Sequence, residues 1–173
     1  MAILIDERKL SNRLNSIRKN LQFLNNGIAG ARLNQNKKSV IIFVKVGSTN
    51  DYTELFKTTN DKIKANYFEV WQYKSLQELE LTKLYFRIEQ KVNLNDYQEI
   101  LSFHIDLDTT DECYKKYPHI HVKHPKLECV SNAHISLNLN DYDATFKSLE
   151  ALDNNISKVL KMINEEFIVK FNV

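Results

Sequence analysis

The chain has 173 residues, which is long enough for one domain to fold on its own hydrophobic core without a disulfide framework or a structural metal. Its 24 Lys and Arg residues nearly balance its 22 Asp and Glu residues, so the net charge of +2 gives no global electrostatic argument for nucleic acid binding. Two cysteines are too few for a disulfide framework, and three glycines leave no Gly-rich phosphate-binding loop. The N-terminus meets charge at Asp6 without an apolar signal or membrane segment, so we expect a cytoplasmic protein without a membrane partner.

The first predicted element is an amphipathic helix within residues 1–30. Its apolar residues recur at spacings of three and four, and they are Leu10, Leu14, Ile17, Leu21 and Leu24. Arginine and lysine side chains, including Arg13, occupy its other faces. Gly27 and Gly30 are expected to end the helix.

Residues 38–140 are predicted to form a mainly antiparallel sheet of five to seven strands. The runs of strand length are Val40–Val46, Tyr67–Tyr73, Leu84–Val92, Ile100–Asp108, the segment around His119 and His121, and Ala133–Leu139. A second amphipathic helix is predicted within residues 141–167. We therefore expect a single α+β domain over residues 1–173, with the C-terminal helix packed on the sheet.

All five histidines lie between His104 and His134, and most of them alternate with apolar residues inside predicted strands. Successive side chains of a strand point to opposite faces, so residues two apart share a face. The pattern predicts one polar face that carries the side chains of Arg87, His104, Asp106, His119, His121, His134 and Ser136.

Three interpretations of this polar face remain open. Neutral imidazoles of His104, His119, His121 and His134, together with a carboxylate, suit a divalent transition metal such as Zn, Mn, Fe or Ni. Alternatively, two imidazoles could act as acid and base in RNA cleavage, with Asp106 orienting one of them and Arg87 or Lys123 balancing phosphorane charge. In the third interpretation the face is the solvated side of an antiparallel sheet.

Aromatic residues near this face have two interpretations as well. Trp71, Tyr73, Tyr85 and Tyr117 could stack on unpaired bases. Aromatic residues at strand positions more often pack in the core or across strands, and we favour that interpretation.

Several short motifs resemble the TumE-like family of bacterial toxins. They are Tyr67–Gln72, Leu84–Arg87, the strand with Asp106, Pro118–His121 and Phe146–Leu152. The resemblance covers about the C-terminal hundred residues. It implies a small toxin or antiphage-defence module that acts as a ribonuclease, with Arg87, Asp106, His119 and His121 in the matching positions. The partners it implies are RNA and an antitoxin.

A second set of motifs is similar to the ubiquitin-conjugating (E2) enzymes. Tyr117-Pro118, His124-Pro125 and Ile135-Ser136-Leu137 follow the order of motifs in that family. Ser136 takes the place of the reactive cysteine. The resemblance therefore implies either a catalytically silent domain or one with a cysteine-to-serine substitution, which binds a ubiquitin-like protein. A third alternative is a non-catalytic immunity or antitoxin-type protein. None of these three functions requires a cofactor, although a divalent metal of unknown identity fits the toxin or defence ribonuclease.

Overall fold

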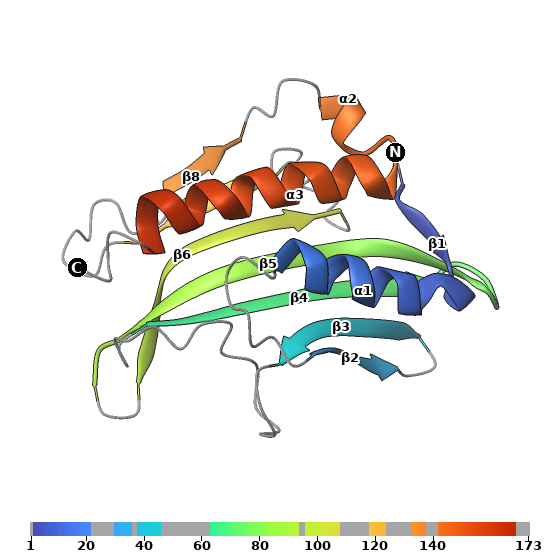
Figure 1. The fold of residues 1–173 in the computed structure, drawn as a ribbon, viewed down its shortest axis with the longest axis horizontal. Helices are drawn as coiled ribbons and strands as arrows, with labels where there is room; N and C mark the ends of the chain where they lie inside the picture. Colours follow the sequence, from blue (N-terminus) through green and yellow to red (C-terminus); the bar gives the residue numbers. More distant parts are fainter. Residues whose placement is uncertain are drawn as a thin grey trace.

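One antiparallel sheet organises the chain (Figure 1). The computed structural model describes residues 2–21, 30–35, 38–45, 63–93, 96–107, 118–123, 133–137 and 142–168. Within these ranges eight strands pair into a single sheet. They are β1 (Leu4–Asp6), β2 (Gly30–Gln35), β3 (Ser39–Lys45), β4 (Ile63–Tyr73), β5 (Glu78–Lys91), β6 (Tyr97–Asp106), β7 (His119–Val122) and β8 (Ala133–Ser136).

Seven of the strands follow one another in sequence order, from β2 to β8, as in a meander. The short β1 stands outside this path and pairs with the start of β5, at Glu78–Glu80. The expected α+β architecture is therefore confirmed, and β1 brings the number of strands to one more than the expected maximum of seven. A strand of three residues carries too little alternation to be recognised in the sequence.

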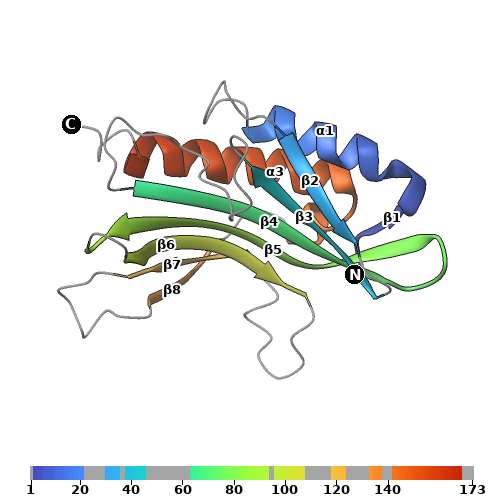
Figure 2. The same cartoon turned by 90° about the horizontal axis from the view of Figure 1, so that it is seen from below.

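Two long helices cover the same face of the sheet (Figures 1 and 2). The helical elements are η1 (Glu7–Lys9), α1 (Leu10–Leu21), α2 (Tyr142–Thr145), α3 (Leu149–Ile163) and the π-helical turn η4 (Asn164–Ile168). The Ser148 side chain caps α3 by accepting a hydrogen bond of 3.1 Å from the Ala151 N–H. None of the helices in the described ranges combines the length and the apolar character needed to cross a bilayer.

The helix boundaries correct two expectations. The segment 1–30 is not all helical, because β1 precedes α1 and Gly30 already belongs to β2. The helical segment expected from residue 141 is divided, since the short α2 is separated from α3, and Ser148 is the cap of the longer helix. Residues 22–29 include Gly27, which was expected to end the first helix, and they lie outside the described residues. Residues 138–141, at the expected start of the second helix, lie outside them too.

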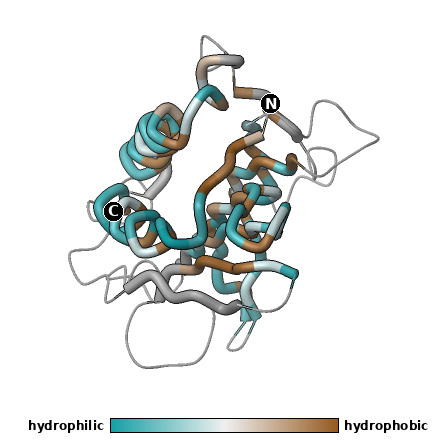
Figure 3. Tube along the Cα trace, turned by 90° about the vertical axis from the view of Figure 1, so that its right-hand side faces the viewer, coloured by the Kyte–Doolittle hydropathy of each residue, from teal (hydrophilic) through white to brown (hydrophobic). Residues whose placement is uncertain are grey.

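Apolar side chains of the strands and helices meet in a continuous core. Leu84, Phe86 and Ile88 of β5 are at most 1% exposed, in agreement with the alternation read from the sequence. On α3 the buried residues return every three or four positions, from Leu152 to Ile163. Figure 3 shows hydrophilic and hydrophobic residues alternating along the helices. The helices thus bury one side against the sheet.

A charged network lies inside this core and joins both helices to the sheet. Arg13 of α1 is 2% exposed and forms ion pairs with Glu69 of β4 and Asp153 of α3. Glu69 also accepts hydrogen bonds from the Tyr67 hydroxyl at 2.5 Å and from the Trp71 indole N–H at 2.8 Å. The sequence placed Arg13 outside the apolar stripe of its helix, and its side chain is nevertheless buried, because its partners lie 56 and 140 residues away along the chain.

Candidate functional site

The polar residues of β5, β6 and β7 share the sheet face opposite the helices. Glu69, which binds Arg13 of α1, is paired with Leu84, so Leu84 faces the helices and its neighbour Tyr85 faces away. Tyr85 is paired with His104, and His104 with His119. Residues directly opposite each other in an antiparallel pair point to the same side. Tyr85, His104 and His119 therefore form one row across the outer face of the sheet.

A second row runs beside the first. Arg87 is paired with Ser102, Ser102 with His121, and His121 with His134. Because these positions are two residues from those of the first row, they lie on the same face. The prediction that His104, His119 and His121 share one face of one sheet is confirmed. Arg87 also occupies this face, as expected.

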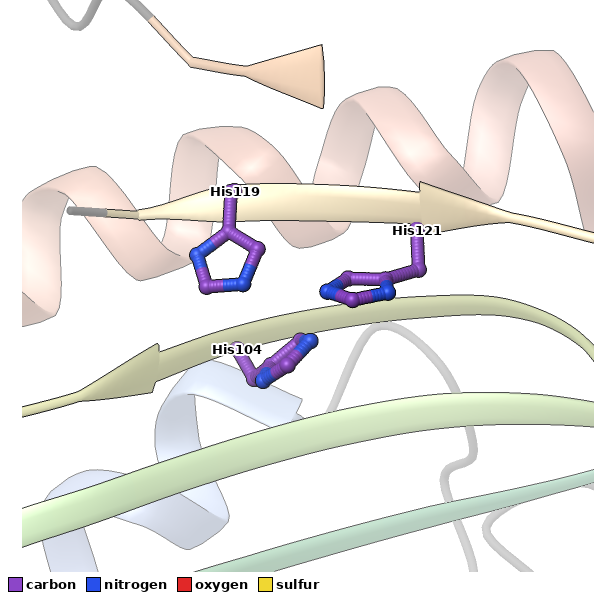
Figure 4. Close-up of side chains that lie close together, drawn as sticks. All are labelled: His104, His119 and His121. Atoms are coloured by element: carbon purple, nitrogen blue, oxygen red, sulfur yellow. The ribbon is translucent and has the colours of Figure 1, made fainter. Parts of the chain in front are cut away.

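Three imidazoles meet where the two rows adjoin, and we call His104, His119 and His121 the histidine cluster (Figure 4). The ring centroid of His104 lies 4.1 Å from that of His119 and 4.2 Å from that of His121. The rings of His119 and His121 are 4.9 Å apart. One ring nitrogen of each residue lies within 4.8 Å of the others, so this group could hold a metal ion.

The histidine cluster is not a solvated surface. His119 is 1% exposed and His104 is 8% exposed, while the neighbouring Asp106 and Ser102 are also buried. The interpretation of this face as the solvated side of the sheet is therefore wrong for His104 and His119, whereas His121 is half-buried. Burying polar groups has a free-energy cost unless they have partners, which makes their concentration here informative.

Asp106 and Tyr85 form a hydrogen-bonded chain with His104. Nδ1 of His104 lies 3.0 Å from Oδ2 of Asp106, and the Tyr85 hydroxyl donates to Oδ1 of the same carboxylate at 2.6 Å. Burial raises the pKa of Asp106, but the hydrogen bonds from His104 and Tyr85 and the charges of His104 and Lys83 outweigh it, so the pKa lies below its usual value. Asp106 is thus an anion that faces Nδ1 of His104.

The aromatic rings of this region pack against one another. Tyr85 stacks on Phe68 at a centroid distance of 4.9 Å and on His104 at 4.7 Å, so both faces of its ring are covered. Trp71 is fully buried. The packing interpretation is confirmed for these two residues, and base stacking by either of them is not supported. The Tyr73 hydroxyl donates a hydrogen bond to the carboxylate of Glu7. Tyr117 lies outside the described residues.

The cations on this face have acidic neighbours. Nε of Arg87 lies 3.3 Å from Oε1 of Glu89, and Nζ of Lys123 lies 3.2 Å from Oε1 of Glu99. These pairs are partly exposed, which limits their contribution to stability. Arg87 is consequently near the histidine cluster but engaged by a carboxylate of its own strand.

Two predicted site residues are placed by their backbone alone. His134 and Ser136 lie on β8, opposite His121 and His119, but their side chains lie outside the described residues. Residues 124–132, which include His124-Pro125 of the E2-like pattern, lie outside them too. The roles predicted for His134 as a metal ligand and for Ser136 as a transfer residue stay predictions.

One member of the site escaped the sequence reasoning. Tyr85 was considered as a packing or base-stacking ring, whereas its hydroxyl holds Asp106. The signal was present, because Tyr85 alternates with Leu84 and Phe86 and so belongs to the polar face. Its pairing with His104 depended on the register between β5 and β6, which the sequence does not state.

Comparisons with known proteins add no relative: no family model matches the chain, and no curated protein or solved structure matches it. The TumE-like and E2-like resemblances are thereby left as predictions. The histidine cluster and its surroundings are the features of this chain from which a function can be inferred.

Proposed function

We propose that this chain is a metal-dependent hydrolase whose divalent metal is bound by His104, His119 and His121. The observation that carries the proposal is the meeting of three imidazoles, with one nitrogen of each within 4.8 Å of the others. Ligand nitrogens on one zinc ion lie roughly 3.4 Å apart, as follows from Zn–N distances of about 2.1 Å in a tetrahedron. Small side-chain rotations would bring the three nitrogens to that separation.

The chemistry of the donors favours zinc among the divalent ions. Imidazole nitrogen suits Zn, Cu, Fe and Ni, whereas Mg and Mn favour oxygen ligands. The carboxylate of Asp106 already accepts hydrogen bonds from Tyr85 and His104, so it is placed behind a ligand and not beside the ion. A site of three histidines without a carboxylate ligand is typical of catalytic zinc.

Three protein ligands would leave one position of a tetrahedral ion for water. A zinc ion in such a site lowers the pKa of its water to about 7, which supplies a nucleophile at neutral pH. The low exposure of His104 and His119 would shield the reaction from bulk solvent and strengthen electrostatic interactions there. Hydrolysis of an ester or phosphodiester is therefore the reaction class that we assign.

Acid–base catalysis without a metal fits the cluster less well. It needs two imidazoles on opposite sides of the reacting phosphate, one to remove a proton and one to supply it. The ring centroids of His104 and its two neighbours are only 4.1 and 4.2 Å apart, which is contact distance for planar rings. No substrate group fits between them.

The TumE-like resemblance adds an expectation about the substrate, which would be RNA. If the chain is a toxin or defence ribonuclease, the phosphodiester of RNA is the bond that the metal site attacks. The same histidine substitutions would then abolish both RNA cleavage and growth arrest.

Metal binding and hydrolysis can be tested in one set of proteins. Equilibrium dialysis against Zn²⁺ should give one zinc per chain, and Co²⁺ should give the intense visible absorption of a tetrahedral site. Bis(p-nitrophenyl) phosphate and p-nitrophenyl acetate serve as probes of phosphodiester and ester hydrolysis. The double variant His119→Ala/His121→Ala should lose metal, absorption and hydrolysis together.

Gln98→Ala is the matched control, because Gln98 is an exposed residue of β6, the strand that carries His104. It should keep all three properties.

The less buried His121→Ala alone serves if the double variant does not fold, as judged by circular dichroism. Equal zinc stoichiometry in His121→Ala and the unsubstituted protein would refute the metal site. Zinc binding without hydrolysis of either probe would refute the hydrolase.

A further inference from the structure

The hydrogen-bonded chain behind His104 suggests how the cluster is prepared for an ion. A neutral imidazole carries its proton on one nitrogen and binds a metal through the other. In metal sites the second nitrogen commonly donates to a carboxylate, which fixes the tautomer and the ring orientation. Nδ1 of His104 lies 3.0 Å from Oδ2 of Asp106, so Nε2 is the nitrogen left for a ligand.

We propose that Asp106, held by the Tyr85 hydroxyl, is a positioning residue that keeps His104 in the Nδ1–H tautomer and so presents Nε2 to the metal. This inference rests on the proposed metal site and adds how one of its ligands is selected. Asp106 would not touch the ion, because its carboxylate lies at Nδ1 of His104, and the group that could hold a metal consists of the three imidazoles alone. Its effect would pass entirely through the imidazole.

Packing supports the same role. The Tyr85 ring stacks on that of His104 at 4.7 Å, and its hydroxyl reaches past the ring to Oδ1 of Asp106 at 2.6 Å. One side chain thereby fixes both the plane of the imidazole and the position of the carboxylate. Asp106 is 6% exposed, so water competes little for these hydrogen bonds.

Asp106→Asn is the decisive substitution. While Tyr85 keeps donating to Oδ1, the amide group that replaces Oδ2 becomes a donor facing Nδ1 of His104. His104 must then accept at Nδ1 and carry its proton on Nε2, where it blocks metal binding. We expect zinc affinity, measured by competition with a chelator, to fall by about 10–100-fold.

The metal-free protein provides a second readout that does not depend on zinc. Long-range ¹H–¹⁵N spectra of the histidine side chains should show the Nδ1–H tautomer of His104 in the unsubstituted chain and the Nε2–H tautomer in Asp106→Asn. A purely structural role of Asp106 would lower thermal stability without exchanging the tautomers.

Tyr85→Phe sharpens the test, because it keeps the ring that stacks on His104 and removes the donor to Asp106. Added to Asp106→Asn, it frees the amide to turn its oxygen towards Nδ1, so the double variant should regain part of the lost zinc affinity. An Nε2–H tautomer of His104 in the unsubstituted chain, or unchanged zinc affinity in Asp106→Asn, would overturn the inference. If His121→Ala abolishes zinc binding and Asp106→Asn does not, the metal site stands and the positioning role fails.

Discussion

The two faces of the sheet each carry a group of buried polar side chains, and the groups differ in how their charges are balanced. On the helix-covered face, the guanidinium of Arg13 pairs with Glu69 and Asp153, and Tyr67 and Trp71 donate to Glu69. On the outer face, three imidazoles touch one another, and Asp106 is the carboxylate that contacts one of them among the described residues.

The two groups of polar side chains suit different roles. In the Arg13 network each buried charge is paired with an opposite charge, so these charged groups already have their partners within the protein. Imidazoles in contact repel one another when more than one is protonated. A cation bound by their neutral forms would resolve that conflict. The Arg13 network joins both helices to the sheet, whereas the histidine cluster is the group at which we propose a metal.

Breaking the Arg13 network should give the largest effect on stability. Arg13→Ala leaves Glu69, which is fully buried, without its cation, and loss of one partner of a buried ion pair costs about 3–5 kcal/mol. Urea unfolding measures this cost, with Arg18→Ala on the exposed side of the same helix as the control. A loss below roughly 1 kcal/mol, the range of a surface pair, would mean that the network does not bind the helices to the sheet.

Zinc should stabilise the protein through the outer face alone. At a free zinc concentration of 100 times the dissociation constant, the free energy of unfolding should rise by about 2.7 kcal/mol. For a chain of this length that corresponds to an increase in Tm of roughly 5–10 °C. Differential scanning calorimetry should show the shift in Arg13→Ala but not in His121→Ala. A zinc shift that survives in His121→Ala would place the ion elsewhere.

Alkaline pH should act on the helix-covered face. Burial and the neighbouring carboxylate of Glu69 raise the pKa of Tyr67 well above its usual value near 10. Because the pKa is raised in the folded state, the stability contributed by neutral Tyr67 is fully present below about pH 10 and is lost as the pH rises towards the folded-state pKa. Tyr67→Phe should flatten this fall in urea unfolding between pH 8 and 11, and an equally steep fall in the variant would exclude Tyr67 as its source.

The smallest effect is expected from His134→Ala. His134 lies opposite His121 in the backbone register of β8, so it is a candidate for a fourth ligand. A hydrolytic site needs that position for water, and we expect one zinc per chain and unchanged probe hydrolysis in this variant. Loss of zinc in His134→Ala would instead indicate a closed site of four histidine ligands. The proposed hydrolase would then be wrong, and the zinc site would be structural.

The amino-acid sequence determined which side chains share a face. Alternation in β5, β6 and β7 assigned Arg87, His104, Asp106, His119 and His121 to one side, because a strand's period of two depends on backbone geometry alone. The amphipathic repeats of the two long helices were equally local, so the α+β architecture could be derived from them.

Only the tertiary structure decided which of those side chains meet. The register between β6 and β7 placed His104 directly opposite His119 and diagonal to His121, and the alternation within each strand does not state that register. Burial of Arg13 depended on Glu69 and Asp153, far away in the sequence, so a charged helix position had no local sign of its place in the core. Local periodicity fixes a residue's face, whereas its contacts require the long-range pairing that folding selects.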